Sequence, residues 1–116
     1  MENDRKEKMK RVYVCSPFAG DIRGNIAHAK IYSLYAIKQG VCPITPHLMF
    51  TQYLNEKDPV QRELGLRCGA DLLQVCDELW VFGDNISEGM SEEIRLAKKL
   101  GMPIRRFRQS FREVSE

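Results

Sequence analysis

Short β-rich runs alternate with helical apolar stripes along this chain, and the alternation limits the folds that it can adopt. The runs, rich in β-branched and aromatic residues, are Arg11–Cys15, Val41–Thr45, Leu79–Phe82 and Pro103–Phe107. Strands that alternate with helices form parallel sheets covered by helices on both faces. The pattern therefore predicts an α/β protein of the flavodoxin or Rossmann-like class, a three-layer sandwich with a central parallel sheet of four to five strands.

Three helices are expected between and after these runs. Asn25 is a suitable N-cap for the first, which ends at Gly40. Asp58 and Pro59 suit the start of the second. The apolar stripe of the second helix, expected to face the core, consists of Leu64, Cys68, Leu72, Val75 and Cys76. The apolar positions of the third helix, which ends at Gly101, are Met90, Ile94, Ala97 and Leu100. Pro43 lies in the second β-rich run and predicts an edge strand.

Length and charge limit the domain organisation and the partners. The 116 residues suffice for one domain with its own core. We expect a flexible charged tail over 1–10, the domain over 11–108 and a C-terminal tail over 109–116. The formal net charge is only +2, so neither a membrane nor a nucleic acid is an expected partner. The charged N-terminus lacks the apolar core of a signal peptide, which predicts a cytoplasmic protein.

The cysteines do not form a metal-binding pattern. The four are Cys15, Cys42, Cys68 and Cys76, which include no C-x-x-C pair. Each lies in or beside an apolar segment, so we expect reduced, buried thiols. Neither a metal nor another cofactor is expected.

Two glutamates lie near the start of the helix that follows Leu79–Phe82. Right-handed crossovers place all strand-to-helix loops on one rim of the sheet, where open α/β sheets bind ligands. Glu93 precedes Ile94 and is expected near the buried edge of this helix, whereas Glu92 points about 100° away, toward solvent. We expect both acids in the first turn of the helix, where they also interact favourably with its dipole, so a structural role stays open. As a reactive group, an ionised Glu93 suits a nucleophile.

Asp71 interrupts the apolar stripe of the second helix. Buried carboxylates are rare unless they are paired or functional. A pair with Arg67, one turn earlier, is the structural alternative. Partial burial would raise the pKa of Asp71, which suits a proton donor.

Polar residues that follow the first two strands are candidates for binding. The loop that begins at Ser16 carries Arg23, Gly24 and Asn25, and backbone N–H groups with an arginine form a natural anion site. The loop matches neither the Walker pattern nor G-x-G-x-x-G, so a plain glycine loop stays open as well. His47 directly follows the second strand and belongs to the same rim.

Three other polar features receive structural interpretations. We interpret His28 as a surface or packing residue and Asp77 as a carboxylate that ties down a turn. The arginines between 105 and 112 are diluted by acidic residues, so we interpret them as a solvated tail or a subunit contact.

Several of these segments resemble the nucleoside 2-deoxyribosyltransferase superfamily. The resemblance takes in the small 2′-deoxynucleoside 5′-phosphate N-hydrolases and uncharacterised bacterial and phage relatives, and it runs from about Arg11 to Phe107. Its nucleophile segment reads Gly89-Met90-Ser91-Glu92-Glu93-Ile94-Arg95-Leu96-Ala97, which selects Glu93. The other similar segments are Asp71-Leu72-Leu73 with Asp77, Tyr13-Val14-Cys15-Ser16 with Arg23-Gly24, and Ser87.

The resemblance implies hydrolysis or transfer at the N-glycosidic bond of a (deoxy)nucleoside or its 5′-monophosphate. Glu93 would attack C1′, and Asp71 would protonate the leaving base or orient the sugar. The residues that would hold a 5′-phosphate are Ser16, Arg23, Asn25 and Ser87. Phe18 and Met90 would flank the base, and the remaining expected binding residues are Gly24, His47 and Gly89. A homodimer or higher homo-oligomer is implied as well.

Departures from the family pattern keep other functions open. Arg95 stands where the family has glycine, and it is expected to narrow or recharge the pocket. The first loop is longer than in the hydrolases, and Arg108–Glu116 does not resemble the segment with which the transferases complete a neighbouring subunit's site. The main alternative is a non-catalytic nucleotide sensor on the same fold. A weaker one is an interaction module that uses the basic tail.

Overall fold

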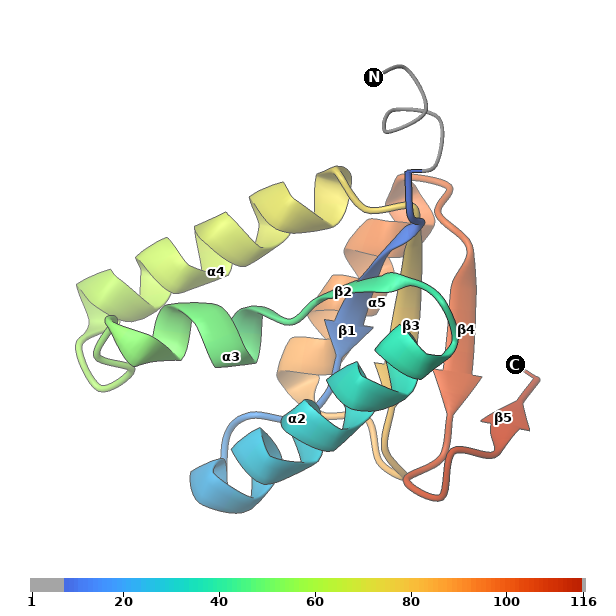
Figure 1. The fold of residues 1–116 in the computed structure, drawn as a ribbon. Coiled ribbons are helices and arrows are strands. Elements are labelled where there is room, and N and C mark those ends of the chain that lie inside the picture. Colours follow the sequence, from blue (N-terminus) through green and yellow to red (C-terminus); the bar gives the residue numbers. More distant parts are fainter. Residues whose placement is uncertain (1–7, 116) are drawn as a thin grey trace, which may run out of the picture.

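A central sheet carries helices on both faces in the computed structural model, which describes residues 8–115 (Figure 1). The elements in chain order are β1 (Arg11–Cys15), α2 (Ile22–Lys38), β2 (Cys42–Ile44), α3 (Pro46–Met49), the 3-10 turn η1 (Phe50–Gln52), α4 (Pro59–Gln74), β3 (Glu78–Phe82), α5 (Glu88–Lys99), β4 (Ile104–Phe107) and β5 (Glu113–Val114). Most of the tail expected over 1–10 lies outside the described residues. Among residues 8–115, no helix combines the length and the apolar character that crossing a bilayer requires.

The sheet has the strand order β2-β1-β3-β4-β5, which confirms the predicted fold class. β1 pairs in parallel with β2 and β3, and β3 pairs in parallel with β4. Pro43 lies in the edge strand β2, as expected. From β1 the chain passes to β2 on one side, and it then crosses to β3 on the other side of β1. The strand order thus reverses between β1 and β3, and open α/β sheets bind ligands at this switch point. The loops after β1, β2 and β3 meet at this rim.

Alternation along the strands sends their side chains to two separate cores. The core under α2 contains Val12, Val14, Tyr32, Ala36, Trp80, Phe82 and Phe107. The core under α4 and α5 contains Tyr13, Cys15, Leu73, Leu79, Val81, Met90 and Ala97. Tyr13 and Cys15 therefore face α4 and α5, and this placement decides which groups surround Glu93.

The first helix begins earlier than predicted. Asp21, not Asn25, is its N-cap, because the Asp21 Oδ1 atom accepts a hydrogen bond from the Gly24 backbone N–H at 3.1 Å. The Asn25 amide instead donates to the carbonyls of Phe18 and Ala19, at 3.0 and 2.9 Å. Asn25 thus closes the preceding loop rather than starting the helix.

The apolar stripe predicted to anchor α4 is mostly exposed. Leu64 and Val75 keep 45% and 53% of their surfaces, whereas Gly69 and Leu73 are the buried residues of the helix. A Cβ atom at Gly69 would lie 3.2 Å from the Tyr13 hydroxyl oxygen, and one at Gly65 would lie 3.3 Å from Leu54 Cδ1. The two glycines allow this close approach, so α4 turns its glycine side inward. Asp58 caps the helix as predicted, accepting from the Val60 N–H at 2.9 Å.

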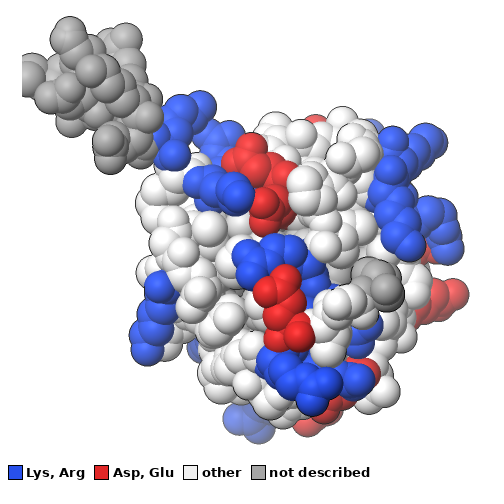
Figure 2. Space-filling model, turned by 90° about the vertical axis from the view of Figure 1, so that its right-hand side faces the viewer, with Lys and Arg blue, Asp and Glu red and all other residues white. Residues whose placement is uncertain are grey.

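Part of the tail expected over 109–116 contributes to the sheet, because Glu113–Val114 form β5. β5 pairs antiparallel with β4. Phe111 packs against Tyr35 with 4.4 Å between ring centroids. A local sequence pattern misses β5 because its partners lie in other elements. Figure 2 shows basic and acidic side chains next to one another on this side of the molecule rather than one continuous basic patch.

Candidate functional site

Glu93 lies in the second turn of α5, on the side that faces β1. The Tyr13 hydroxyl donates a hydrogen bond of 2.6 Å to Glu93 Oε2. The Cys15 thiol lies near this carboxylate, and its Sγ atom donates to the Met90 carbonyl at 3.9 Å. Both residues come from the carboxyl-terminal half of β1, two positions apart, and therefore face the same side of the sheet. The fold thus holds one glutamate carboxylate at the switch-point rim with one hydroxyl donor and a neighbouring thiol from the same strand.

The environment of Glu93 acts on its pKa in two directions. Burial raises the pKa above the ordinary glutamate value, while the Tyr13 hydroxyl and the nearby Cys15 thiol lower it and only partly offset the burial. Burial also raises the pKa values of the Tyr13 hydroxyl and the Cys15 thiol, so both groups stay protonated donors. Burial thus disfavours the ionised form of Glu93, which is the form that acts as a nucleophile, and the Tyr13 hydroxyl favours it.

The two residues next to this site, Glu92 and Arg95, point away from it. Glu92 is exposed, as predicted, and pairs with Arg95, whose side chain keeps 68% of its surface. Arg95 was expected to narrow or recharge the pocket. It instead occupies the solvent side of α5, because the Glu92–Arg95 pair spans one turn on that side.

Asp71 does not have the expected surroundings. It is exposed and borders a groove of about 510 Å³ with Phe50 and Arg67. Gly69, two residues earlier, is the α4 position that faces Tyr13. Two residues of an α-helix are about 200° apart, so Asp71 projects from nearly the opposite side. The predicted partial burial of Asp71 is wrong, and the hydrogen bonds and charges that shift the pKa of Glu93 include no second carboxylate.

His47 and Phe18 form one wall near the end of β1. Their rings stack with 4.9 Å between centroids. His47 Nε2 lies 3.0 Å from the Ser16 carbonyl oxygen, and since a carbonyl only accepts, this nitrogen carries the proton. Burial lowers the pKa of His47, so the ring is neutral at neutral pH. The Ser16 hydroxyl is buried without a hydrogen-bond partner among the described residues.

The predicted residues at the start of α5 have mixed environments. Ser87 is the N-cap, and its Oγ accepts from the Met90 N–H at 3.2 Å. Met90 was expected to flank a base, but it is 1% exposed and packs in the core under α5. An apolar side chain at this helix position covers Val81 and Cys15 instead of the rim. Gly89 is exposed, with open space where a Cβ atom would lie.

The predicted residues at the start of α2 lie on the other side of β1. Arg23 is exposed, and none of the hydrogen bonds or ion pairs among the described residues involves its side chain. The Gly24 N–H is used by the cap at Asp21. Asn25 borders the rim cavity, so of these residues it is the one that reaches a cavity.

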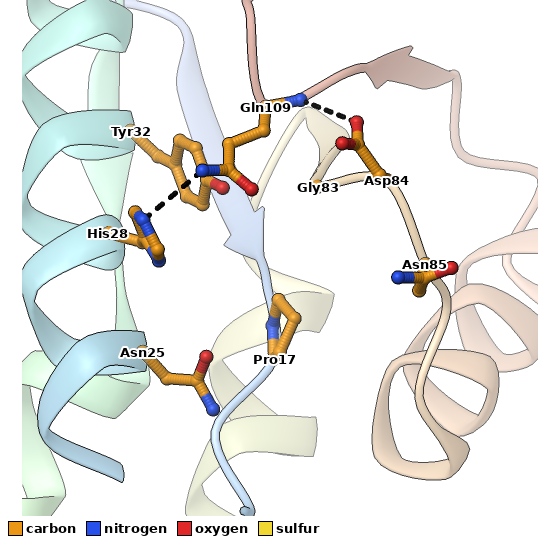
Figure 3. Close-up of a pocket in the computed structure, with 8 residues that line it drawn as sticks. All are labelled: Pro17, Asn25, His28, Tyr32, Gly83, Asp84, Asn85 and Gln109. Atoms are coloured by element: carbon orange, nitrogen blue, oxygen red, sulfur yellow. Dashed lines mark hydrogen bonds between the residues drawn. The ribbon is translucent and has the colours of Figure 1, made fainter. Parts of the chain in front are cut away.

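The rim cavity lies on the α2 side of the switch point and has a volume of about 220 Å³ (Figure 3). Its lining residues are Pro17, Asn25, His28, Tyr32, Gly83, Asp84, Asn85 and Gln109. The Gln109 side chain lies 3.3 Å from His28 Nε2, and the Gln109 backbone N–H donates to Asp84 Oδ1 at 3.0 Å. The lining contains no lysine or arginine. The cavity therefore suits an uncharged hydrogen-bonding group better than an anion.

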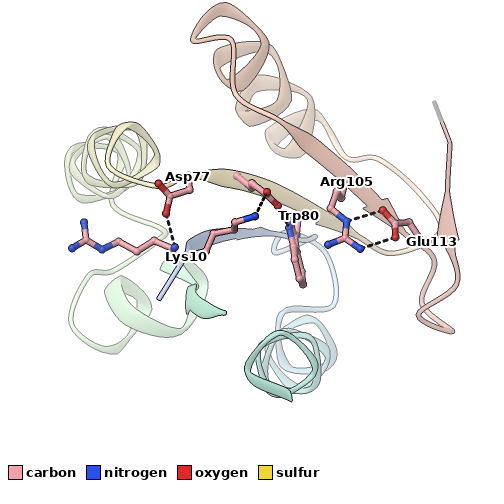
Figure 4. Close-up of polar contacts among 7 residues, drawn as sticks. Lys10, Asp77, Trp80, Arg105 and Glu113 are labelled. Carbon is pink, nitrogen blue, oxygen red and sulfur yellow. Dashed lines mark hydrogen bonds and ion pairs between the residues drawn. The ribbon is translucent and has the colours of Figure 1, made fainter. Parts of the chain in front are cut away.

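Other polar residues fix the sheet rather than the site (Figure 4). Asp77 accepts a hydrogen bond from the Arg11 backbone N–H at 2.7 Å, which agrees with its interpretation as a structural carboxylate. Lys10 pairs with Glu78 at 2.7 Å. Arg105 pairs with Glu113 through two hydrogen bonds of 2.7 Å. Arg105 therefore links β4 to β5.

Sequence reasoning missed two residues of the site, Tyr13 and Arg106. Alternation along β1 could have placed Tyr13 on the side of α5, but its partner is 80 positions away in sequence. Arg106 was interpreted as part of a basic tail. Its Nη2 atom donates to the Gly83 carbonyl at 3.2 Å, so it braces the loop between β3 and α5. Residues 8–115 contain no group of three or more His, Cys, Asp or Glu side chains that could hold a metal ion.

Comparisons with known proteins agree with this architecture. The sequence model of a family described as "Domain of unknown function (DUF7768)" matches residues 10–107. No curated protein sequence matches the chain. Among solved structures, the 2-deoxyribosyltransferase of Bacillus psychrosaccharolyticus superposes with a TM-score of 0.71 at 17% identity, over 90% of this chain and 77% of the other.

Two further solved structures share the fold over smaller parts of their own length. A 2-deoxyribosyltransferase from Leishmania mexicana gives a TM-score of 0.57 at 18% identity, over 85% of this chain and 64% of that one. A conserved protein from Enterococcus faecalis V583 gives a TM-score of 0.61 at 19% identity, over 85% of this chain and 63% of that one. This chain thus spans less than two thirds of either protein. At such identities the likenesses establish a common fold.

Proposed function

We propose that this chain, which belongs to the DUF7768 family of domains of unknown function, acts at the N-glycosidic bond of a nucleoside or nucleotide. The observation that carries the proposal is the 2.6 Å hydrogen bond by which Tyr13 holds the Glu93 carboxylate at the switch-point rim. The fold shared with two 2-deoxyribosyltransferases supports the same chemistry. The proposed substrate is a deoxynucleoside or its 5′-monophosphate.

Glu93 is the proposed nucleophile. One carboxylate oxygen attacks C1′ of the sugar, the C1′–N bond breaks, and its electron pair leaves with the base through an oxocarbenium-like transition state. The base takes up a proton from water, and a glycosyl ester remains on Glu93. Water hydrolyses this ester, or a second base accepts the sugar. Tyr13 keeps its proton throughout and acts as a positioning residue, because its hydroxyl stabilises the carboxylate before attack and after release.

The proposed binding residues lie near the rim and carry hydroxyl, guanidinium or ring groups that are not fully used within the described residues. The buried Ser16 hydroxyl has no protein partner in the described chain, and the Ser87 hydroxyl, which accepts in its cap, can still donate. With the N–H groups at the start of α5 they form the proposed contact to a 5′-phosphate. Arg23 is a further candidate for that contact. His47 and Phe18 offer a flat wall for the base.

The proposal is tested with Glu93→Gln and the adjacent control Glu92→Gln. Purified protein is mixed with common deoxynucleosides and their monophosphates, and free base is read by chromatography. We expect base release from the wild-type protein and from Glu92→Gln, because Glu92 is exposed and pairs with Arg95. Glu93→Gln should release none above background. Equal release by the two variants would rule out Glu93 as the nucleophile.

A second candidate function is a nucleotide sensor without turnover. The observation in its favour is that Gly69, and not the acid Asp71, faces Tyr13 and Glu93, so no neighbouring carboxyl group is positioned to protonate a leaving base. The sensor predicts nucleotide binding in equilibrium dialysis, with the ligand recovered intact after hours. The enzyme predicts that the same incubation yields free base.

A further inference from the structure

We infer that the exposed side of α4 is the surface on which a second copy of this chain docks. This α4 face consists of Val60, Leu64, Arg67, Cys68, Asp71 and Val75. At about 100° per residue, all six positions fall within a sector of about 100° on the helix. Figure 1 shows α4 at the outside of the molecule, with part of its length extending beyond the sheet. The inference does not depend on the proposed glycosidic chemistry.

Apolar exposure is the first observation behind this inference. Val60, Leu64 and Val75 keep 69%, 45% and 53% of their surfaces. A groove of about 510 Å³ runs along the same face and includes Phe50 and Leu72. Contiguous exposed apolar surface rimmed by polar residues marks interaction sites. The sequence carries an apolar stripe on this helix, and the fold of one copy leaves that stripe uncovered.

The charges on the α4 face are self-complementary, and they identify the occupant. Arg67 and Asp71 are both exposed and line the groove, yet neither takes part in the ion pairs found within residues 8–115. In a two-fold interface, residue i of one copy meets residue j of the other, and j meets i. An antiparallel pair of α4 helices therefore joins Arg67 of each copy to Asp71 of the other. The same pairing of two copies buries the apolar side chains of both α4 faces and forms two ion pairs.

The exposed face of α2 serves as a comparison. Ile31, Leu34 and Ile37 keep 50–54% of their surfaces, so α2 is about as apolar as α4 on its outer side. Its charged neighbours are Lys30 and Lys38, and α2 contains no acidic residue. Pairing two copies through α2 would bring like charges together, which disfavours association. Of these two apolar helix faces, only α4 can pair with itself.

The pairing register follows from the ion pairs. If Arg67 meets Asp71 of a second copy, the two-fold axis passes beside the middle of α4, and Leu64 packs near Val75 of that copy. Cys68 lies close to the axis, so the two Cys68 thiols approach each other across helices about 8–10 Å apart. A short bis-maleimide can then join them. The remaining thiols allow a clean assay, because Cys15 and Cys76 are buried and Cys42 can be changed to serine.

The first test measures mass in solution and crosslinking of the full chain. We expect a dimer by light scattering at tens of micromolar, and a covalent dimer with bis-maleimide in Cys42→Ser that disappears when Cys68→Ser is added. Leu64→Lys should shift the protein to monomer. The matched control Leu34→Lys, on the α2 face, should leave the dimer intact. Circular dichroism verifies that each variant is folded, which is expected because both side chains are half exposed.

A charge exchange tests the pairing itself. Arg67→Glu and Asp71→Arg each place like charges opposite one another and should raise the dissociation constant of the dimer at least tenfold. High salt screens this repulsion and should restore part of the dimer. The double variant Arg67→Glu/Asp71→Arg restores opposite charges and should restore the dimer. A wild-type monomer at these concentrations would overturn the inference. So would a dimer that survives Leu64→Lys, lacks the Cys68 crosslink, or is not rescued by the double exchange.

Discussion

Removing the Tyr13 hydroxyl tests how the fold holds Glu93. Tyr13 is 1% exposed, and its hydroxyl lies 2.6 Å from Glu93 Oε2. Tyr13→Phe keeps the ring in the core and deletes only the donor. A hydrogen bond to a charged group contributes about 1.5–3 kcal/mol to stability, and a neutral one about 0.5–1.5 kcal/mol. At a pH high enough to ionise Glu93, Tyr13→Phe should therefore lower the free energy of unfolding by about 1.5–3 kcal/mol.

The cost of Tyr13→Phe should depend on pH. Burial raises the pKa of Glu93 above its unfolded value, so folding favours the protonated form. The stability that protonation of Glu93 contributes is present below the pKa of the unfolded state and is lost as pH rises through the pKa of the folded state. Tyr13 counteracts part of that loss, because its hydrogen bond favours the ionised form. The cost of Tyr13→Phe should thus shrink by about 1 kcal/mol when Glu93 is protonated.

Urea unfolding followed by circular dichroism measures these differences, at a pH near 4 and at pH 7.5. Glu93→Gln removes the titrating group, so Tyr13→Phe in that background should cost about 0.5–1.5 kcal/mol at both pH values. Glu93→Gln alone should gain stability over the wild type as pH rises. A cost of Tyr13→Phe that is the same at both pH values and in both backgrounds would refute the reasoning.

Four further substitutions probe α4, α5 and the sheet edge. Gly69→Ala places a Cβ atom 3.2 Å from the Tyr13 hydroxyl oxygen and should reduce base release. Gly89→Ala meets open space and should stabilise the fold by about 0.5–1 kcal/mol. Equal losses of activity in the two variants would contradict this difference. Asp58→Ala removes the α4 cap and should cost about 1 kcal/mol in urea unfolding, and no cost would show that the cap is dispensable. Arg105→Ala should cost at most about 1 kcal/mol, since its ion pair is half exposed, and should change the fluorescence of the single tryptophan, over whose ring it lies at 4.7 Å.

Local signals explain which parts of the fold could be predicted from the sequence. The strand Arg11–Cys15 was predicted with its observed bounds because β-branched residues end there at a proline. Asp58 and Pro59 mark the start of α4 through cap chemistry that needs no distant partner. Pro43 indicated the edge strand because proline removes a backbone donor. Each of these signals lies within a few residues of the element that it predicts.

Nonlocal contacts explain the errors. Asp21 and Asn25 are both able to cap a helix, and only the folded loop shows which one meets a free N–H. The inward face of α4 was assigned to its apolar stripe, but close packing of Gly69 on Tyr13 turns the helix the other way and leaves Asp71 outside. β5 pairs with β4, and Phe111 beside it packs against Tyr35 of α2, a contact that no local pattern indicates. The site residue Tyr13 depends on a partner in another element.

The most direct test of the central claim is mass spectrometry of protein quenched during turnover of a deoxynucleoside or its monophosphate. A glycosyl ester on Glu93 predicts a peptide that contains residue 93 and is heavier by one sugar moiety, present in the wild type and absent from Glu93→Gln. Base release without that adduct under conditions that trap esters, or an adduct that persists in Glu93→Gln, would contradict the account.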